Sequence, residues 1–178
     1  MKILYQGSPG AYSHLAALEV YPDAEIIPCK TFDECFSRAQ KDEKLKIIIP
    51  ESNKTTGNIG IEYLIFQYRL NIYAEHFHRI EHNLLGIPGA KIKDIKNVLS
   101  HAQGLSQCSD YIKKNNLIEN VRADTAGSAE AVSKNKKITD AAIASKLSAK
   151  IYKLDVIDSN IENEKGNTTR FLIMGKPI

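Results

Sequence analysis

Cysteine is scarce in this chain of 178 residues, and the few cysteines present form no recognisable framework. Cys29, Cys35 and Cys108 are odd in number and lack the close paired spacing of a metal site. This usage predicts reduced thiols in a cytoplasmic protein rather than a disulfide-bonded secreted one. Cys108, in the segment "SQCSDYI", is expected to act as a small buried apolar group on a helix.

Long apolar runs and a strong excess of one charge are also absent. No apolar run approaches the roughly 20 residues that span a bilayer, and "MKILYQGSPG" is too short in apolar residues for a secretory signal. The net charge is +3, with Lys and Arg spread along the chain rather than clustered. We therefore expect a cytoplasmic location, with no membrane or nucleic-acid partner.

Several familiar catalytic and cofactor motifs are missing. No G-x-G-x-x-G or G-x-x-x-x-G-K-[ST] is present, so a nucleotide cofactor has no support. No G-x-S-x-G is present, and the neighbours Ser100 and His101 do not make a nucleophile–base pair. In "HFHRIEH", His76 and His78 would share one side of a strand, with His82 further along. Because no carboxylate or cysteine completes a set, exposed strand histidines and no metal are expected.

What the sequence does contain is an alternation of short apolar runs with amphipathic stretches, which is typical of the α/β class. Strands are predicted at 2–5, 25–28, 46–50, 97–100, 118–123, 141–144, 154–158 and 168–174. Helices are predicted at 13–21, 31–40, 59–68, 101–115, 125–134 and 145–152. Ser13 is a candidate N-cap, and Thr31 with Glu34 has the spacing of a capping box.

Residues 71–87 interrupt this alternation with a long stretch rich in β-branched and aromatic residues. We expect one or two extended strands there, crossing between two halves of the molecule. The predicted architecture is α/β with two subdomains facing a cleft. The first subdomain would hold residues 1–75 and 166–178, and the second residues 76–165.

The loops that follow the predicted strands share a chemistry of hydroxyls, amides and glycines. They are "GSPGAYS", "ESNKTTGN", the stretch from His101 through Gln103 and Gln107, and "DTAGSA" with Thr125 and Ser128. Each loop alone is explained by ordinary turn and capping chemistry. Four of them at the same ends of strands, next to helix N-termini, favour a small anionic ligand.

The same loops carry a family resemblance. "GSPGAYSHLAA" resembles the opening "GPxGSYSHxAA" of prephenate dehydratases, "IPESNKTTGNI" resembles "PIENTSSGxI", and "RIEHNLL" resembles "IxHxLL". "LSHAQGLSQC" is similar to "YSHPQxxxQC", "DTAGSAEAV" and "AAIAS" match a small-residue loop and strand, and "GNTTRFLIM" resembles "NxTRFxxx". These blocks fall in family order and span nearly the whole chain.

The resemblance implies a fold similar to type II periplasmic binding proteins and the conversion of prephenate to phenylpyruvate, water and carbon dioxide in phenylalanine biosynthesis. It implies no cofactor, prephenate as the small-molecule substrate, and a homodimer. It makes Thr169 the catalytic residue. The expected substrate-binding residues are Arg170, Phe171, Thr168, Asn53, Thr55, Thr56, Gly57, Ser8, Ser13, His101, Gln103 and Ser128.

The sequence departs from the family pattern at three places. Ala11 replaces a small hydroxyl residue, with Ser8 or Ser13 as stand-ins. Aligned on Gly57, the family "ENT" becomes "SNK", so its Glu is either lost or shifted to Glu51. The chain also ends soon after "TRF", so no ACT regulatory domain, and no inhibition by phenylalanine through one, is expected.

The chemistry suits neutral donors, because the substrate is a dianion whose ring becomes aromatic as it loses carbon dioxide and a hydroxyl. Thr169 is a weak acid and must act as a positioned hydrogen-bond donor to the leaving oxygen. Arg170 would point away from it along a regular strand, where it either binds a carboxylate or forms a structural ion pair. Phe171 packs against the substrate ring or fills the core. The alternatives are an arogenate dehydratase and a non-catalytic binding protein for small carboxylates.

Overall fold

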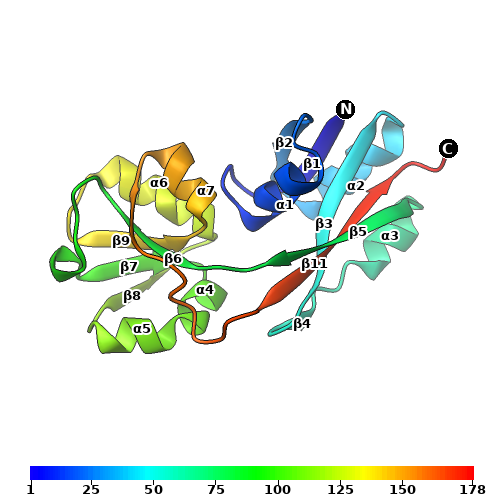
Figure 1. Ribbon diagram of the computed structural model, residues 1–178. Coiled ribbons are helices and arrows are strands. Elements are labelled where there is room, and N and C mark those ends of the chain that lie inside the picture. The colour runs from blue at the N-terminus through cyan, green and yellow to red at the C-terminus, as the bar shows by residue number, and fades with distance from the viewer. The chain divides into compact units, whose positions relative to one another are not determined.

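The computed structural model describes residues 1–178 and divides them into two compact units. The first unit holds residues 1–8, 12–80 and 166–178, and the second holds residues 9–11 and 81–165. Each unit is a mixed β-sheet with helices on both faces (Figure 1). The α/β class with two subdomains is thus confirmed.

The first unit is built on the sheet β2-β1-β3-β11-β5, with β4 paired to β3. Its strands are β1 (Lys2–Gln6), β2 (Glu25–Cys29), β3 (Leu45–Asn53), β4 (Gly57–Asn58), β5 (Asn71–Arg79) and β11 (Thr168–Gly175), and its helices are α1 (Tyr12–Val20), α2 (Phe32–Lys41) and α3 (Glu62–Tyr68). β1 pairs in parallel with β2 and β3, whereas β11 runs antiparallel to both β3 and β5.

Alternation along the strands separates two buried faces of this sheet. Leu4, Ile47 and Met174 pack with α2 and α3 in one core cluster. Their neighbours along the strands, such as Ile3 and Phe171, are equally buried and face α1, which lies across the sheet from α2 and α3 (Figure 1). Burial on both faces explains why β3 reads as an unbroken apolar run.

The second unit is built on the sheet β10-β6-β9-β7-β8. Its strands are β6 (Asn83–Gly86), β7 (Asn97–Ser100), β8 (Ile118–Val121), β9 (Asp140–Ala144) and β10 (Asp155–Asp158), and its helices are α4 (Ala102–Gln107), α5 (Ser109–Lys114), α6 (Thr125–Asn135) and α7 (Lys146–Tyr152), with a short 3-10 turn at Ile92–Asp94. One core cluster lies between the sheet and α4 and α5, and a second lies between the sheet and α6 and α7 (Figure 1). Ala141, Ala142 and Ala144 let helices approach both sides of β9.

Most predicted elements are present, and three details differ. The helix expected at 101–115 is two helices that break at Cys108, whose φ of −114° and ψ of 18° are not helical. The loop expected after β3 is the tight hairpin of β3 and β4. Ser13 is not an N-cap, because α1 already begins at Tyr12 and Ser13 is buried in its first turn.

The capping prediction at Thr31 is confirmed, since its side chain accepts a hydrogen bond from the Glu34 amide at 3.1 Å. Glu34 reaches back to the amide of Lys30 at 2.8 Å, one residue earlier than the usual capping box. Cys29, Cys35 and Cys108 are free and buried, as small apolar groups would be. None of the helices combines the length and apolar character that crossing a membrane requires.

Candidate functional site

The first residues of β11 bring Thr169 against the end of β3. In the antiparallel register Thr169 lies opposite Asn53, and the Asn53 Nδ2 donates a hydrogen bond of 2.8 Å to the Thr169 Oγ1. Thr169 is only 7% exposed, and it belongs to none of the three apolar core clusters. The strand pairing therefore holds this hydroxyl in a fixed, polar setting.

The rest of the Asn53 amide holds the hairpin turn in shape. Its Oδ1 accepts hydrogen bonds from the backbone amides of Thr55, at 2.9 Å, and Thr56, at 3.2 Å. Gly57 closes the turn with a φ of 84°, a left-handed conformation that favours glycine, and pairs with Asn53 across the hairpin. The helix start expected beside these residues is not there, because α3 begins only at Glu62.

The hydrogen bonds to Asn53 determine which group donates and which accepts between Asn53 and Thr169. Two backbone N–H groups point at the Asn53 Oδ1, so its other amide atom must be the NH₂ that faces Thr169. The Thr169 oxygen is then an acceptor from Asn53, which leaves its own hydrogen free to be donated. No protein group accepts that hydrogen in the structure, and a hydroxyl that already accepts one bond is polarised toward giving another.

Arg170 is held by two carboxylates on neighbouring strands. Its Nε and Nη2 both donate to Glu75 Oε2 on β5 at 2.7 Å, and its Nη1 lies 3.5 Å from Glu51 Oε2 on β3. Hydrogen bonding to Glu75 raises the pKa of Arg170 above its ordinary value, and the charges of Glu75 and Glu51 add to the effect. The guanidinium of Arg170 thus forms ion pairs with carboxylates on both neighbouring strands.

A β-bulge explains how Glu51 reaches Arg170. Arg170 lies opposite Ser52 and Phe171 lies opposite Pro50, so Glu51 is an extra residue in β3. Glu51 also accepts a short hydrogen bond from the Ser52 hydroxyl. The sequence left open whether Glu51 replaces the glutamate of the family pattern. The bulge brings the Glu51 carboxylate to Arg170 on the paired strand β11.

Thr168 and Phe171, which flank Thr169 and Arg170 in β11, have different surroundings. Phe171 is 1% exposed, and its ring meets that of His78 edge-on at 6.5 Å, so its contacts in the first unit are those of a core residue. The Thr168 hydroxyl donates to the Gly166 carbonyl at 3.1 Å. Its own carbonyl accepts from the Lys54 amide at 2.9 Å, which ties the hairpin turn to β11.

The other predicted residues do not join this group by any direct bond. Ser8 lies in the turn after β1, and Ser13 is buried in α1. In the second unit, the His101 Nδ1 accepts from the Gln103 amide at 3.2 Å and so caps α4, while Gln103 is exposed. The buried Ser128 hydroxyl, in the first turn of α6, donates to the carbonyl of the N-cap residue Asp124 at 2.8 Å.

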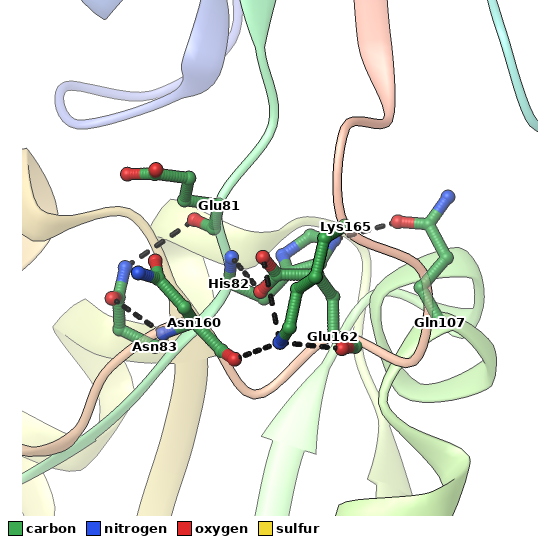
Figure 2. Close-up of polar contacts among 7 residues, drawn as sticks. All are labelled: Glu81, His82, Asn83, Gln107, Asn160, Glu162 and Lys165. Atoms are coloured by element: carbon green, nitrogen blue, oxygen red, sulfur yellow. Dashed lines mark hydrogen bonds and ion pairs between the residues drawn. The ribbon is translucent and has the colours of Figure 1, made fainter.

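A buried polar cluster in the second unit escaped the sequence reasoning (Figure 2). His82 Nε2 donates to the Oε1 of Gln107 at 2.6 Å, and the His82 amide donates to Glu162 Oε2 at 3.0 Å. Lys165 lies over Glu162 and donates to its carbonyl at 2.9 Å. Burial lowers the pKa of His82, although Gln107 and Glu162 oppose the effect. The cluster joins the segment before β6 to the one that leads back to β11.

This cluster unites two of the motifs that carry the family resemblance, "RIEHNLL" and "LSHAQGLSQC". Each contributes one partner of the His82–Gln107 hydrogen bond, and that pairing is visible only in three dimensions. His82 is 3% exposed, so its ring is a structural element of this unit rather than an exposed strand histidine. His78 is likewise buried, at 7% exposed, so the expectation of exposed histidines is wrong for both.

Asn167 is a further candidate, two residues before Thr169. It is 6% exposed, and its Oδ1 is buried without a hydrogen-bond partner. Such an orphaned oxygen is uncommon and calls for an explanation. The signal that could have found it is the asparagine of the "NxTRF" pattern.

A surface groove of about 420 Å³ in the second unit, lined by Ala90–Ile92 and Asp155–Asp158, contains none of the predicted site residues.

Comparison with known proteins gives these motifs a context. The Arabidopsis thaliana protein named arogenate dehydratase/prephenate dehydratase 1, chloroplastic, is 42% identical over 179 residues. The alignment covers 99% of this chain but 45% of the relative, so the chain spans less than half of that protein's length.

The solved structures agree on the fold. A prephenate dehydratase from Staphylococcus aureus superposes with a TM-score of 0.86 at 27% identity, covering 100% of this chain and 67% of that one. A putative methionine-binding lipoprotein from Bacillus subtilis reaches a TM-score of 0.50 at 10% identity, covering 99% and 83%, which speaks for a shared binding-protein architecture alone. The model of the family described as prephenate dehydratase matches residues 3–178. The chain belongs to the prephenate dehydratase family.

Proposed function

We propose that this chain catalyses the decarboxylating dehydration of prephenate to phenylpyruvate. The ring carbon–carboxylate bond breaks and its electron pair enters the ring as carbon dioxide leaves. The ring carbon–oxygen bond breaks in turn, and the hydroxyl leaves as water after taking up one proton. Prephenate dianion and one proton therefore become phenylpyruvate anion, carbon dioxide and water, and the reaction requires no oxidant or cofactor.

The observation that carries the proposal is the hydrogen bond from Asn53 to Thr169. The Thr169 hydroxyl accepts that bond and points its own hydrogen at the departing ring hydroxyl, to which it donates a hydrogen bond, while the proton that completes the water comes from solvent. Threonine is too weak an acid to ionise, so its contribution is a fixed direction that suits the leaving oxygen as charge builds on it. Removing a single donor of this kind costs about 3 kcal/mol of transition-state stabilisation, a factor of about a hundred.

The neighbouring residues divide between positioning and binding. Asn53 is a positioning residue, because it orients the Thr169 oxygen through one amide group and holds the turn through the other. The amides of Thr55 and Thr56 are already used by Asn53, so their exposed hydroxyls are the groups left for a substrate carboxylate. Arg170 acts by joining β3, β11 and β5 through Glu51 and Glu75 rather than by binding the substrate. Neutral donors then dominate the site.

The test is an assay of phenylpyruvate formation with three purified proteins: the unaltered chain, Thr169→Ala and Thr169→Ser. We expect Thr169→Ala to lower kcat at least about a hundredfold with a native circular dichroism spectrum. Thr169→Ser restores the hydroxyl and should stay within roughly tenfold of the unaltered chain, since only the rotamer preference is relaxed. Equal activity of Thr169→Ala and the unaltered chain would remove Thr169 from the mechanism.

Arogenate is the rival substrate, and the Arabidopsis relative carries both activities in its name. Arogenate has an amino acid side chain where prephenate has a keto acid, so the reacting ring is the same. Parallel measurements of kcat/KM with the two compounds decide the preference. A third candidate, a binding protein for small carboxylates, predicts tight binding of prephenate in calorimetry with no phenylpyruvate formed.

We further propose a homodimer in a cytoplasmic setting. The free, buried thiols of Cys29, Cys35 and Cys108 support a reducing compartment. The assembly is tested by size-exclusion chromatography coupled to light scattering, where a mass near twice 19.9 kDa is expected. A mass of one chain at all concentrations would contradict the dimer.

A further inference from the structure

Two histidines and a carboxylate from distant parts of the chain meet on the α1 side of the first sheet. His76 and His78 lie two residues apart on β5 and point to one face, and Glu19 comes from the last turn of α1. The His76 Nε2 lies 2.7 Å from the Glu19 Oε2, and the His78 Nδ1 lies 2.9 Å from the same oxygen. The sequence pattern could not place a carboxylate here, because Glu19 is 57 residues away from His76.

We propose that Glu19, His76 and His78 form a binding site for a divalent cation of the zinc class. One donor atom from each residue is available, and the three atoms lie within 4.8 Å of one another. Zinc bound by imidazole and carboxylate has bond lengths of about 2.0–2.2 Å, so tetrahedral donors stand roughly 3.4 Å apart. The two hydrogen-bonded separations of 2.7 and 2.9 Å need to open by about 0.5–0.7 Å for the metal to replace the two hydrogen bonds.

The ligands are held as a metal site requires. His78 has an 8% exposed side chain, with the ring of Phe171 edge-on at 6.5 Å and that of Tyr12 tilted at 6.2 Å. β5 is paired with β11 along its whole length, so the two imidazoles stand on a rigid strand. The metal would join α1 to this strand, which is the edge of its sheet.

The electrostatics and the solvent access also fit a cation. Partial burial by itself raises the pKa of Glu19, but the hydrogen bonds and charges of His78 and His76 outweigh it and hold that pKa below its ordinary value. Zinc binding requires an ionised carboxylate and neutral imidazoles, so any imidazole proton is released when the metal binds. The side chains of Glu19 and His76 are 45% and 26% exposed, which leaves room for water as a fourth ligand. Two imidazoles and one carboxylate select zinc over magnesium, which prefers oxygen ligands.

The site adjoins Thr169 without depending on its role. In the register of β5 and β11, His78 lies directly opposite Thr169. Thr169→Ala should nevertheless bind zinc like the unaltered chain, because Thr169 supplies no ligand. Binding and turnover can therefore fail separately, and the metal site stands or falls apart from the proposed reaction.

The test is a calorimetric titration of the chelator-treated 178-residue chain with zinc chloride, repeated with magnesium chloride. We expect one zinc per chain and no heat of magnesium binding, visible d–d absorption of a four-coordinate site when cobalt replaces zinc, and a rise in Tm of roughly 5–10 °C at zinc a hundredfold above its Kd. Chelator should reverse the rise.

Matched variants locate the metal. His76→Ala and Glu19→Gln should each weaken zinc binding at least about tenfold. His101→Ala and Glu43→Gln make the same two substitutions elsewhere in the chain and should leave zinc binding unchanged. Both ligand variants lie at least partly on the surface, and circular dichroism checks that they fold. An absence of zinc binding, or zinc binding that His76→Ala and Glu19→Gln leave intact, would overturn the proposal and leave a hydrogen-bonded triad only.

Discussion

Replacement of Asn53 by aspartate separates the two tasks of this residue. Aspartate keeps an oxygen for the amides of Thr55 and Thr56, which now donate at 2.9 and 3.2 Å, so the hairpin turn should survive. The other oxygen would replace an NH₂ group that donates to Thr169 across 2.8 Å. A carboxylate cannot donate, and it attracts the Thr169 hydrogen to itself instead.

The expected size of the effect follows from this reversal. The Thr169 hydrogen no longer points at the leaving oxygen, so the variant loses the same hydrogen-bond donor that Thr169→Ala removes. The expected cost is about 3 kcal/mol of transition-state stabilisation, or about a hundredfold in kcat. The free energy of unfolding should change by less than about 1 kcal/mol, because the turn bonds remain. Asn53→Ala is the contrasting variant, since it loses the turn bonds as well and should lower stability by roughly 1–2 kcal/mol.

The assay combines phenylpyruvate formation with urea unfolding of the unaltered chain and both Asn53 variants. The proposal requires Asn53→Asp to unfold near the unaltered midpoint while its kcat falls as far as that of Thr169→Ala. Its relative activity should also recover as the pH is lowered toward about 4, where a carboxyl group regains a proton to donate. Unaltered kcat in Asn53→Asp would refute the directional hydrogen bond on which the mechanism rests.

Two further predictions concern the stability of the second unit, which holds both Gly10 and His82. Gly10→Ala should lower the free energy of unfolding by about 2–3 kcal/mol, because Gly10 has a φ of 96° and a Cβ there would lie 2.4 Å from the Ser148 Oγ. Gly89→Ala is the control, because Gly89 also has a positive φ but a Cβ there would meet no neighbouring atom. Its free energy of unfolding should fall by less in the same urea titration. Burial lowers the pKa of His82, so as the pH falls its ring stays neutral in the folded state while the same ring takes up a proton in the unfolded chain. The free energy of unfolding should therefore be highest above about pH 6.5 and decline below it. His82→Gln should flatten that decline in part, since burial also lowers the pKa of His14, and an unchanged slope would contradict this origin.

Local sequence patterns predicted the elements of this fold and indicated Thr169 as the candidate catalytic residue. Apolar runs alternating with amphipathic stretches predicted the α/β class, because strand and helix periodicities are local properties of the chain. The capping of α2 by Thr31 was predicted for the same reason, since its partner is three residues away. The motif "GNTTRF" singled out Thr169, which the strand pairing then placed beside Asn53.

Several predictions failed where the deciding partner is distant in sequence. The histidines of "HFHRIEH" were expected to be exposed, but the packing of α1 on β5 buries His78 and brings Glu19 to it. The helical stretch 102–114 breaks at Cys108, where neither a glycine nor a proline is present. The break follows the packing of α4 and α5 around one core cluster in which Cys108 is fully buried.

The sequence alone determined that this is an α/β protein of the prephenate dehydratase pattern with a hydroxyl at position 169. Only the tertiary structure decided what surrounds that hydroxyl. Asn53 is 116 residues away from Thr169, and the direction of their hydrogen bond depends on a hairpin turn that no periodicity encodes. The bulge at Glu51, which turns Arg170 into a link between strands, likewise arises from the pairing of β3 with β11. Periodicity is set by neighbours along the chain, whereas the chemistry of a site is set by groups that only folding brings together.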